Sequence, residues 1–244
     1  MNAIETHGLT RVFGSTRAVD GASLAVECGT VFGLLGANGA GKSTLLKLLV
    51  GHLRPTSGTA AVLGEPVSGP RPALWERVGY VAQARYLPGW MTGADCLRFA
   101  GSLRRNWDAA KADRLAQRLQ FPLEARVRDL SRGHYVRLQI ALAMGHNPEL
   151  ILLDEPTSGL DPVGRHELLG ILVEELGQRG CTVVISSHLV EDIERMADTV
   201  AIMEAGRIVA CGPVDAVKSE AAGGGMDSVS LEQAFFAYVN RRQL

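Results

Sequence analysis

The sequence has few cysteines and no long apolar run, and each shortage excludes a class of protein. Its four cysteines form no CxxC pair and no zinc-ligand spacing, and a chain of 244 residues needs no disulfides to fold, so we expect a reducing compartment. The first residues include an acid and lack a basic segment, which predicts no signal peptide and a chain that stays inside the cell. Apolar stretches such as residues 150–153 are far shorter than the roughly 20 residues of a membrane-spanning helix. A link to a membrane would therefore require a partner.

An excess of charge of either sign is also missing. The 25 Lys and Arg residues balance 26 Asp and Glu residues, which leaves a formal net charge of -1. Because nucleic-acid binding usually leaves a basic footprint, no nucleic-acid partner is expected. A hydrophobic content of 46% against 21% charged residues is typical of a globular chain with a sizeable core.

The pattern of apolar residues and turn signals predicts an α/β fold. Residues 1–35 favour short antiparallel strands, residues 84–147 favour helices with no strand, and residues 148–212 alternate strand and helix, which indicates a mainly parallel sheet. A hairpin is expected over 199–210, a glycine-rich linker at 223–225, and a last helix that begins with a capping box at 230–233. We expect four parts: 1–83 with the antiparallel β subdomain and the first part of the core, 84–147 as an inserted helical subdomain, 148–212 as the second part of the core, and 213–244 as a linker and helix.

One glycine-rich segment matches the phosphate-binding pattern G-x-x-x-x-G-K-[ST] between an expected strand and helix. Its glycines let backbone N–H groups turn toward phosphate oxygens, and the helix that follows directs its positive end there. Lys42 would reach the β- and γ-phosphates of ATP, and the Ser43 hydroxyl would ligate Mg2+. These residues predict a P-loop NTPase whose ATP-binding residues are Gly36, Ala37, Asn38, Gly39, Ala40, Gly41, Lys42, Ser43 and Thr44.

Two adjacent acids, Asp154 and Glu155, end the apolar strand expected at 150–153. A buried parallel strand delivers such side chains to the carboxyl edge of the sheet, where ligands bind. Asp154 is the candidate Mg2+ ligand. Successive side chains on a strand point apart, so Glu155 is free to act as the general base that activates a water.

With these two motifs the chain resembles the nucleotide-binding subunit of an ATP-binding cassette (ABC) transporter over nearly all of its length. The resemblance implies a role for further residues that occur in the family's order. Phe13 would stack on adenine, Gln83 would touch Mg2+ or the attacking water, and His188 would contact the γ-phosphate. A loop that crosses the dimer interface would comprise Ser158, Gly159, Leu160 and Asp161.

The signature segment departs from the family's usual Leu-Ser-Gly-Gly-Gln. This chain has Ser131, Arg132, Gly133 and His134, so Arg and His replace the second and last members of the Ser-Gly-Gly-Gln part. Ser131 is expected to cap the next helix and, with Gly133, to face the γ-phosphate bound by the other subunit. A left-handed backbone at Arg132 would cost about 1–2 kcal/mol, so we expect ordinary helical geometry there. The basic residue, with the element at 106–108, is similar to ABC-2-type exporter ATPases.

The resemblance further implies two cassettes, in a homodimer or a heterodimer, that close around ATP. It also implies a separate transmembrane permease that holds the protein at the inner face of the membrane. The permease would dock on the apolar side chains that follow Gln83, namely Tyr86, Leu87, Trp90, Met91 and Phe99, although these could equally pack the helical subdomain. The sequence predicts an ATP-hydrolysing exporter subunit. The alternatives left open are an importer subunit and a weakly hydrolysing regulatory or non-transport ABC ATPase.

Overall fold

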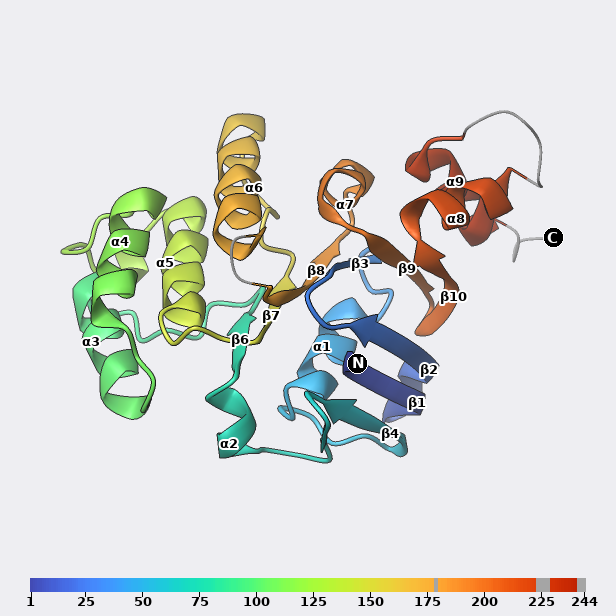
Figure 1. The fold of residues 1–244 in the computed structure, drawn as a ribbon, viewed down its shortest axis with the longest axis horizontal. Coiled ribbons are helices and arrows are strands. Elements are labelled where there is room, and N and C mark those ends of the chain that lie inside the picture. The colour runs from blue at the N-terminus through green and yellow to red at the C-terminus, as the bar shows by residue number, and fades with distance from the viewer. Residues whose placement is uncertain (178–179, 223–228, 241–244) are drawn as a thin grey trace. The chain divides into compact units, whose positions relative to one another are not determined.

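The computed structural model describes residues 1–177, 180–222 and 229–240. The chain divides into two compact units, one made of Met1–Arg71 and Thr182–Leu244 and the other of Pro72–Cys181. Figure 1 labels the helices and strands of both.

The first unit holds an antiparallel sheet with the strand order β2-β1-β4-β5 and a set of mainly parallel strands. In the parallel set, β3 pairs with both β8 and β9, and β10 runs antiparallel to β9. All of β8 and nearly all of β3 are buried, as expected for parallel strands covered on both faces. The strands are β1 (Asn2–Phe13), β2 (Thr16–Glu27), β3 (Val31–Leu35), β4 (Ser57–Val62), β5 (Glu65–Pro66), β8 (Thr182–Ser187), β9 (Thr199–Glu204) and β10 (Arg207–Pro213).

The helices described in the first unit are α1 (Lys42–Leu49), α7 (Val190–Met196), α8 (Val214–Ala221) and α9 (Leu231–Asn240). Helix α7 packs against β3 and β8, whereas α9 packs against α7 and α8. The expected capping box is present, because the Gln233 N–H donates to Ser230 Oγ at 3.1 Å and the Ser230 N–H donates to Gln233 Oε1 at 2.9 Å. It starts a helix whose Leu231, Ala234 and Tyr238 are buried.

The second unit combines one pair of parallel strands with helices. Its elements are α2 (Pro72–Trp75), β6 (Val78–Val81), α3 (Gly93–Leu103), α4 (Ala109–Leu119), the 3-10 helix η1 (Val127–Asp129), α5 (Arg132–Met144), β7 (Leu150–Asp154) and α6 (Pro162–Gly177). Helix α5 packs against α3, α4 and β6, and Figure 1 shows α4 and α5 side by side. Strands β6 and β7 pair in parallel with Val81 opposite Leu153, so their carboxyl ends meet at one edge.

The antiparallel N-terminal sheet, the mainly parallel core strands and the strand-free helical stretch confirm the expected fold class. Two helices were not indicated by the sequence. Helix α2 is a single turn, too short to show a period, and α8 buries only Val217, so its apolar stripe is weak. The linker expected at 223–225 lies outside the described residues, and so does Gln178, at which the sequence pattern predicts the end of a helix that starts at Gly164. The four-part division stays a prediction.

The element at 106–108 joins three segments of the second unit. Asn106 Nδ2 donates to the carbonyl oxygens of Glu76 at 3.0 Å and His146 at 2.9 Å, and the Asp108 carboxylate caps α4 through the Lys111 N–H at 2.8 Å. The Trp107 ring fills the space beside Gly145, where an added Cβ would lie 2.5 Å from ring atom Cη2. This junction therefore fixes the start of α4 against the end of α5.

We expect Gly145→Ala to lower the free energy of unfolding by about 1–3 kcal/mol, because the new methyl group must displace a rigid indole ring. Urea unfolding monitored by circular dichroism measures the difference. The matched control is Gly170→Ala in α6, where an added Cβ meets nothing within 4 Å and should stabilise the helix by about 0.5–1 kcal/mol. Equal stabilities of the two variants would contradict the packing argument.

Candidate functional site

The glycine-rich loop connects β3 to α1 in the first unit, and close backbone contacts require glycine at its first and last glycine positions, Gly36 and Gly41. A Cβ on Gly36 would lie 2.4 Å from the Met203 carbonyl oxygen, and one on Gly41 would lie 2.2 Å from the Ala18 carbonyl oxygen. Gly41 also has a φ of 110°, in the region that favours glycine. The loop's crest, residues 37–39, is exposed.

Lys42 is the first residue of α1, and its side chain is buried beneath this loop. Its Nζ donates to the Gly36 carbonyl at 2.6 Å and to the Ala37 carbonyl at 3.1 Å, and only 5% of the residue is exposed. Ser43 and Thr44 follow in the first turn of the helix. The loop therefore brings an ammonium group and a helix N-terminus to one place, an arrangement suited to phosphate oxygens.

His188 directly follows β8 and lies beside the start of the glycine-rich loop. Ser187, the residue before it, is opposite Leu35 in the sheet, and its carbonyl accepts a hydrogen bond from the Gly36 N–H at 3.3 Å. The first unit thus brings the backbone of His188 next to Gly36.

Phe13 ends β1 and keeps 43% of its surface exposed. The guanidinium carbon of Arg11 lies 4.5 Å from the ring centroid, and Arg11 Nη1 donates to the Arg54 carbonyl at 2.9 Å. A cation held over one face of an aromatic ring is attracted to it and restricts its orientation. The sequence analysis predicted a role for Phe13 but not for Arg11. The signal that could have found Arg11 is its position two residues earlier on the same strand, which places both side chains on one face.

In the second unit, Asp154 and Glu155 lie at the carboxyl end of β7 and are 1% and 3% exposed. Glu155 has a φ of 51°, which is uncommon for a residue with a side chain and is a form of strain found at functional sites. Burial and the nearby charge of Asp154 raise the pKa of Tyr80, so its phenol stays protonated. Gln83 is exposed just beyond the end of β6, at the same sheet edge as these two acids.

The signature segment begins α5. Ser131 is the N-cap, and its Oγ accepts the His134 N–H at 3.2 Å, as predicted. Arg132 is the first helical residue and has no positive φ, which agrees with the expectation from the sequence.

The segment 158–161, expected to form a dimer loop, lies against this helix start. Arg132 Nε donates to the Ser158 carbonyl, and a Cβ on Gly133 would lie 3.2 Å from Leu160 Cδ2. Asp161 caps α6 by accepting the N–H groups of Val163 at 3.0 Å and Gly164 at 2.9 Å. These bonds, that from Gly164 most of all, hold the pKa of Asp161 below its usual value. The second unit thus brings the expected signature and dimer segments together.

Comparison with known proteins decides the family. The family model described as ABC transporter matches residues 19–158, more than half of the chain. The chain belongs to the ABC transporter family. The resemblance identified from the sequence is thereby confirmed.

Three similar proteins show how far the likeness extends. The daunorubicin/doxorubicin resistance ATP-binding protein DrrA of Streptomyces peucetius is 39% identical over 89% of this chain and 67% of its own length. The probable multidrug ABC transporter ATP-binding protein YbhF of Escherichia coli is 34% identical over 97% of this chain, which spans only 42% of that protein. The dimeric structure of a bacterial ABC transporter cassette has a TM-score of 0.78 at 21% identity, over 86% of this chain and 98% of that one, and supports the fold.

Each unit, taken by itself, offers an oxygen ligand of the kind that Mg2+ accepts when it is bound together with a nucleotide. Among the described residues, no group of three or more His, Cys, Asp or Glu side chains could form a metal cage. Mg2+ is commonly bound by one or two protein oxygens together with phosphates, and the Ser43 hydroxyl and the Asp154 carboxylate are oxygens of that kind. Within residues 1–177, 180–222 and 229–240, no helix is both long and apolar enough to cross a bilayer.

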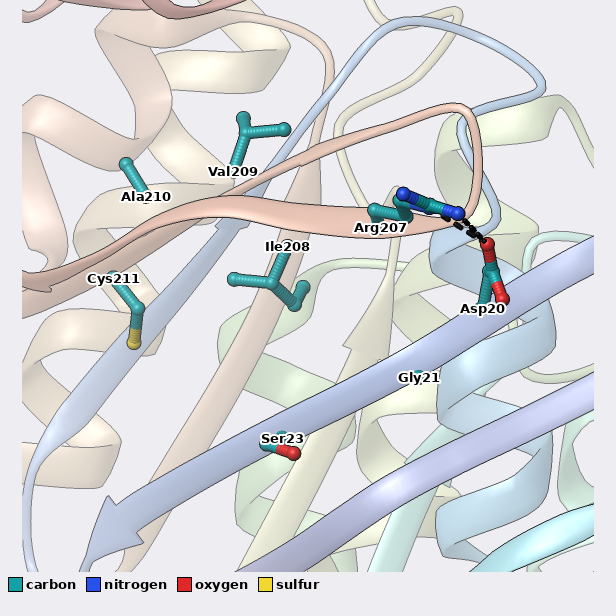
Figure 2. A pocket seen from close by; sticks show the side chains of 8 residues that line it. All are labelled: Asp20, Gly21, Ser23, Arg207, Ile208, Val209, Ala210 and Cys211. Atoms are coloured by element: carbon teal, nitrogen blue, oxygen red, sulfur yellow. Dashed lines mark hydrogen bonds and ion pairs between the residues drawn. The ribbon is translucent and has the colours of Figure 1, made fainter.

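A pocket of about 590 Å³ lies elsewhere in the first unit of the cassette, between β2 and β10. Figure 2 shows its lining: Asp20, Gly21 and Ser23 on one side and residues 207–211 on the other. Arg207 Nε donates to the Asp20 carboxylate at 2.6 Å and holds the pKa of Asp20 below its usual value. The expected ATP-site residues are not among those lining it.

We expect Lys42→Ala to weaken ATP binding about 10- to 100-fold, because a charge-assisted hydrogen bond to phosphate is lost. Titration with a fluorescent ATP analogue measures the dissociation constant. Lys47→Ala removes the same group from the same helix and should leave binding unchanged. If both variants bind ATP like the unchanged protein, Lys42 does not contact the phosphates.

Proposed function

We propose that this chain is the ATP-binding and ATP-hydrolysing subunit of an ABC transporter that powers export through a separate membrane subunit. The observation that carries the proposal is the glycine-rich loop with Lys42 buried beneath its carbonyl groups, in a chain of the ABC transporter family. Such a loop has its backbone N–H groups and its cation ready to receive a triphosphate.

The residues of the site divide the work of phosphoryl transfer. Lys42 would neutralise phosphate charge, Ser43 and Asp154 would hold Mg2+, Gln83 would touch Mg2+ or the attacking water, and Glu155 would accept a proton from that water. A Mg2+ ion held by these residues would supply positive charge that offsets the negative charge developing on the phosphate. His188, whose backbone lies next to Gly36, would contact the γ-phosphate, and Phe13, held by the Arg11 guanidinium, would stack on the adenine.

Two copies of the cassette would close around ATP. The Ser131–His134 segment and the 158–161 loop gather on one surface of the second unit and are themselves partly or fully exposed, which supports a contact made with another subunit. The dimeric arrangement of a structurally similar cassette supports the same assembly. ATP binding then joins the subunits, and hydrolysis removes the shared phosphate and separates them.

Export is supported by the names of the relatives, which describe drug resistance and a multidrug transporter. The permease would contact the side chains that follow Gln83. Tyr86, Trp90 and Phe99 are 66%, 74% and 56% exposed, an unusual exposure for aromatic residues. The interpretation of Met91 as a docking residue was wrong, because Met91 is 7% exposed and belongs to the core.

We expect Glu155→Gln to slow ATP turnover by roughly 10² to 10⁴, the usual contribution of a general base, while ATP affinity is retained. A phosphate-release assay measures turnover, and size-exclusion chromatography with Mg-ATP should show that the variant accumulates as a dimer. Glu124→Gln, a change at an exposed carboxylate, is the matched control. Undiminished turnover in Glu155→Gln would refute the assignment.

We expect Trp90→Ala to weaken co-purification with the membrane subunit at least about tenfold, since a large aromatic anchor is removed from the interface. Pull-down from detergent extracts of cells that express both subunits provides the measurement. Val173→Ala truncates another exposed apolar side chain, on α6, and should bind normally. Equal recovery with both variants would exclude this surface as the docking site.

A further inference from the structure

We propose that Arg85 and Tyr135 are positioning residues that join the loop after Gln83 to the signature segment, so that a displacement of one moves the other. The physical link concerns the second unit alone, and its consequence for the dimer rests on the proposed function. For clarity, residues 84–91 are called the docking loop and residues 127–131 the signature approach.

Arg85 reaches from the docking loop to the carbonyl groups that precede the signature serine. Its Nη2 donates to the Leu130 carbonyl at 2.8 Å and to the Val127 carbonyl at 3.2 Å. Leu130 is the residue directly before Ser131, the N-cap of α5. The position of the Arg85 side chain therefore restricts the backbone that aims Ser131.

Tyr135 completes the link from the other side. The residue is 2% exposed, and the Arg85 guanidinium carbon lies 4.5 Å from its ring centroid. Its hydroxyl oxygen accepts the N–H groups of Tyr86 at 2.8 Å and Leu87 at 3.2 Å. One phenol oxygen thus holds two consecutive backbone donors of the docking loop against the first turns of α5.

Backbone hydrogen bonds extend the connection. The Val127 N–H donates to the Met91 carbonyl at 2.8 Å, and the Arg128 N–H donates to the Gly89 carbonyl at 3.2 Å. Residues 82–91, all within the described part of the chain, form neither helix nor strand, so these cross-bonds take the place of a regular ladder. The docking loop and the signature approach are consequently held together at both ends.

Because of these bonds, a movement of the docking loop also moves Ser131. Several partly buried hydrogen bonds would have to break for the two segments to move separately, whereas moving them together breaks none. A permease that shifts the docking loop through Trp90 would therefore shift the Ser131 Oγ that faces the ATP of the partner cassette.

Hydrogen exchange of the isolated chain tests the link without any partner. Tyr135→Phe should raise exchange about tenfold, equivalent to about 1.4 kcal/mol, at Tyr86 and Leu87 and also at Val127, Arg128 and His134. Arg85→Met, a change at an exposed residue that should fold normally, should give the same spread. Faster exchange confined to Tyr86 and Leu87, or to the residues beside Arg85, would overturn the proposal.

The consequence for the dimer is measured in a Glu155→Gln background with Mg-ATP. Adding Tyr135→Phe or Arg85→Met should weaken dimerisation about tenfold while the ATP affinity of the monomer stays unchanged. Tyr238→Phe in α9 and Arg98→Met in α3 remove the same groups elsewhere and should change neither quantity. Normal dimerisation despite altered exchange would overturn the positioning role. A Glu155→Gln protein that never dimerises would refute the proposed dimer instead, and the exchange data would still decide the link.

Discussion

The close approach of two glycines to backbone carbonyl oxygens is the constraint on which the glycine-rich loop of the first unit depends. Gly36 meets the carbonyl of Met203 on β9, and Gly41 meets the carbonyl of Ala18 on β2. The loop is therefore fixed between strands of two different sheets, and Lys42 Nζ donates to the Gly36 carbonyl beneath it. A phosphate-binding loop set in this way needs little rearrangement to receive its ligand.

In the second unit, side-chain hydrogen bonds hold the start of helix α5 in place. Arg132 ties the start of α5 to the segment at Ser158, and Arg85 with Tyr135 ties it to the loop after β6. Three segments that are distant in sequence are thus connected at the N-terminus of one helix. Because separating these segments would break several hydrogen bonds, they move together more readily than apart.

Much of this could be predicted from the sequence, because the decisive features are local. The glycine pattern before Lys42, the apolar run before Asp154 and the Ser131 cap each depend on neighbours in the chain, and the fold class follows from strand and helix periodicity. The contact of Arg11 with Phe13 and the link between Arg85 and Tyr135 have no such signature, since a surface arginine has the same appearance in sequence whether or not it finds a distant partner. Met91 was misjudged for a related reason: an apolar residue in a loop does not reveal whether the loop folds inward.

The left-handed backbone of Glu155 has a consequence for how this protein could be stabilised. A glycine at that position would adopt the same φ of 51° without steric penalty, whereas a glutamate raises the energy of the folded state by roughly 1–2 kcal/mol. The free energy of folding alone would thus favour glycine over the Glu155 carboxylate. Selection of this chain for heat resistance, without a requirement for activity, should consequently favour glycine at residue 155. The resulting cassette would be more stable and would lack ATPase activity.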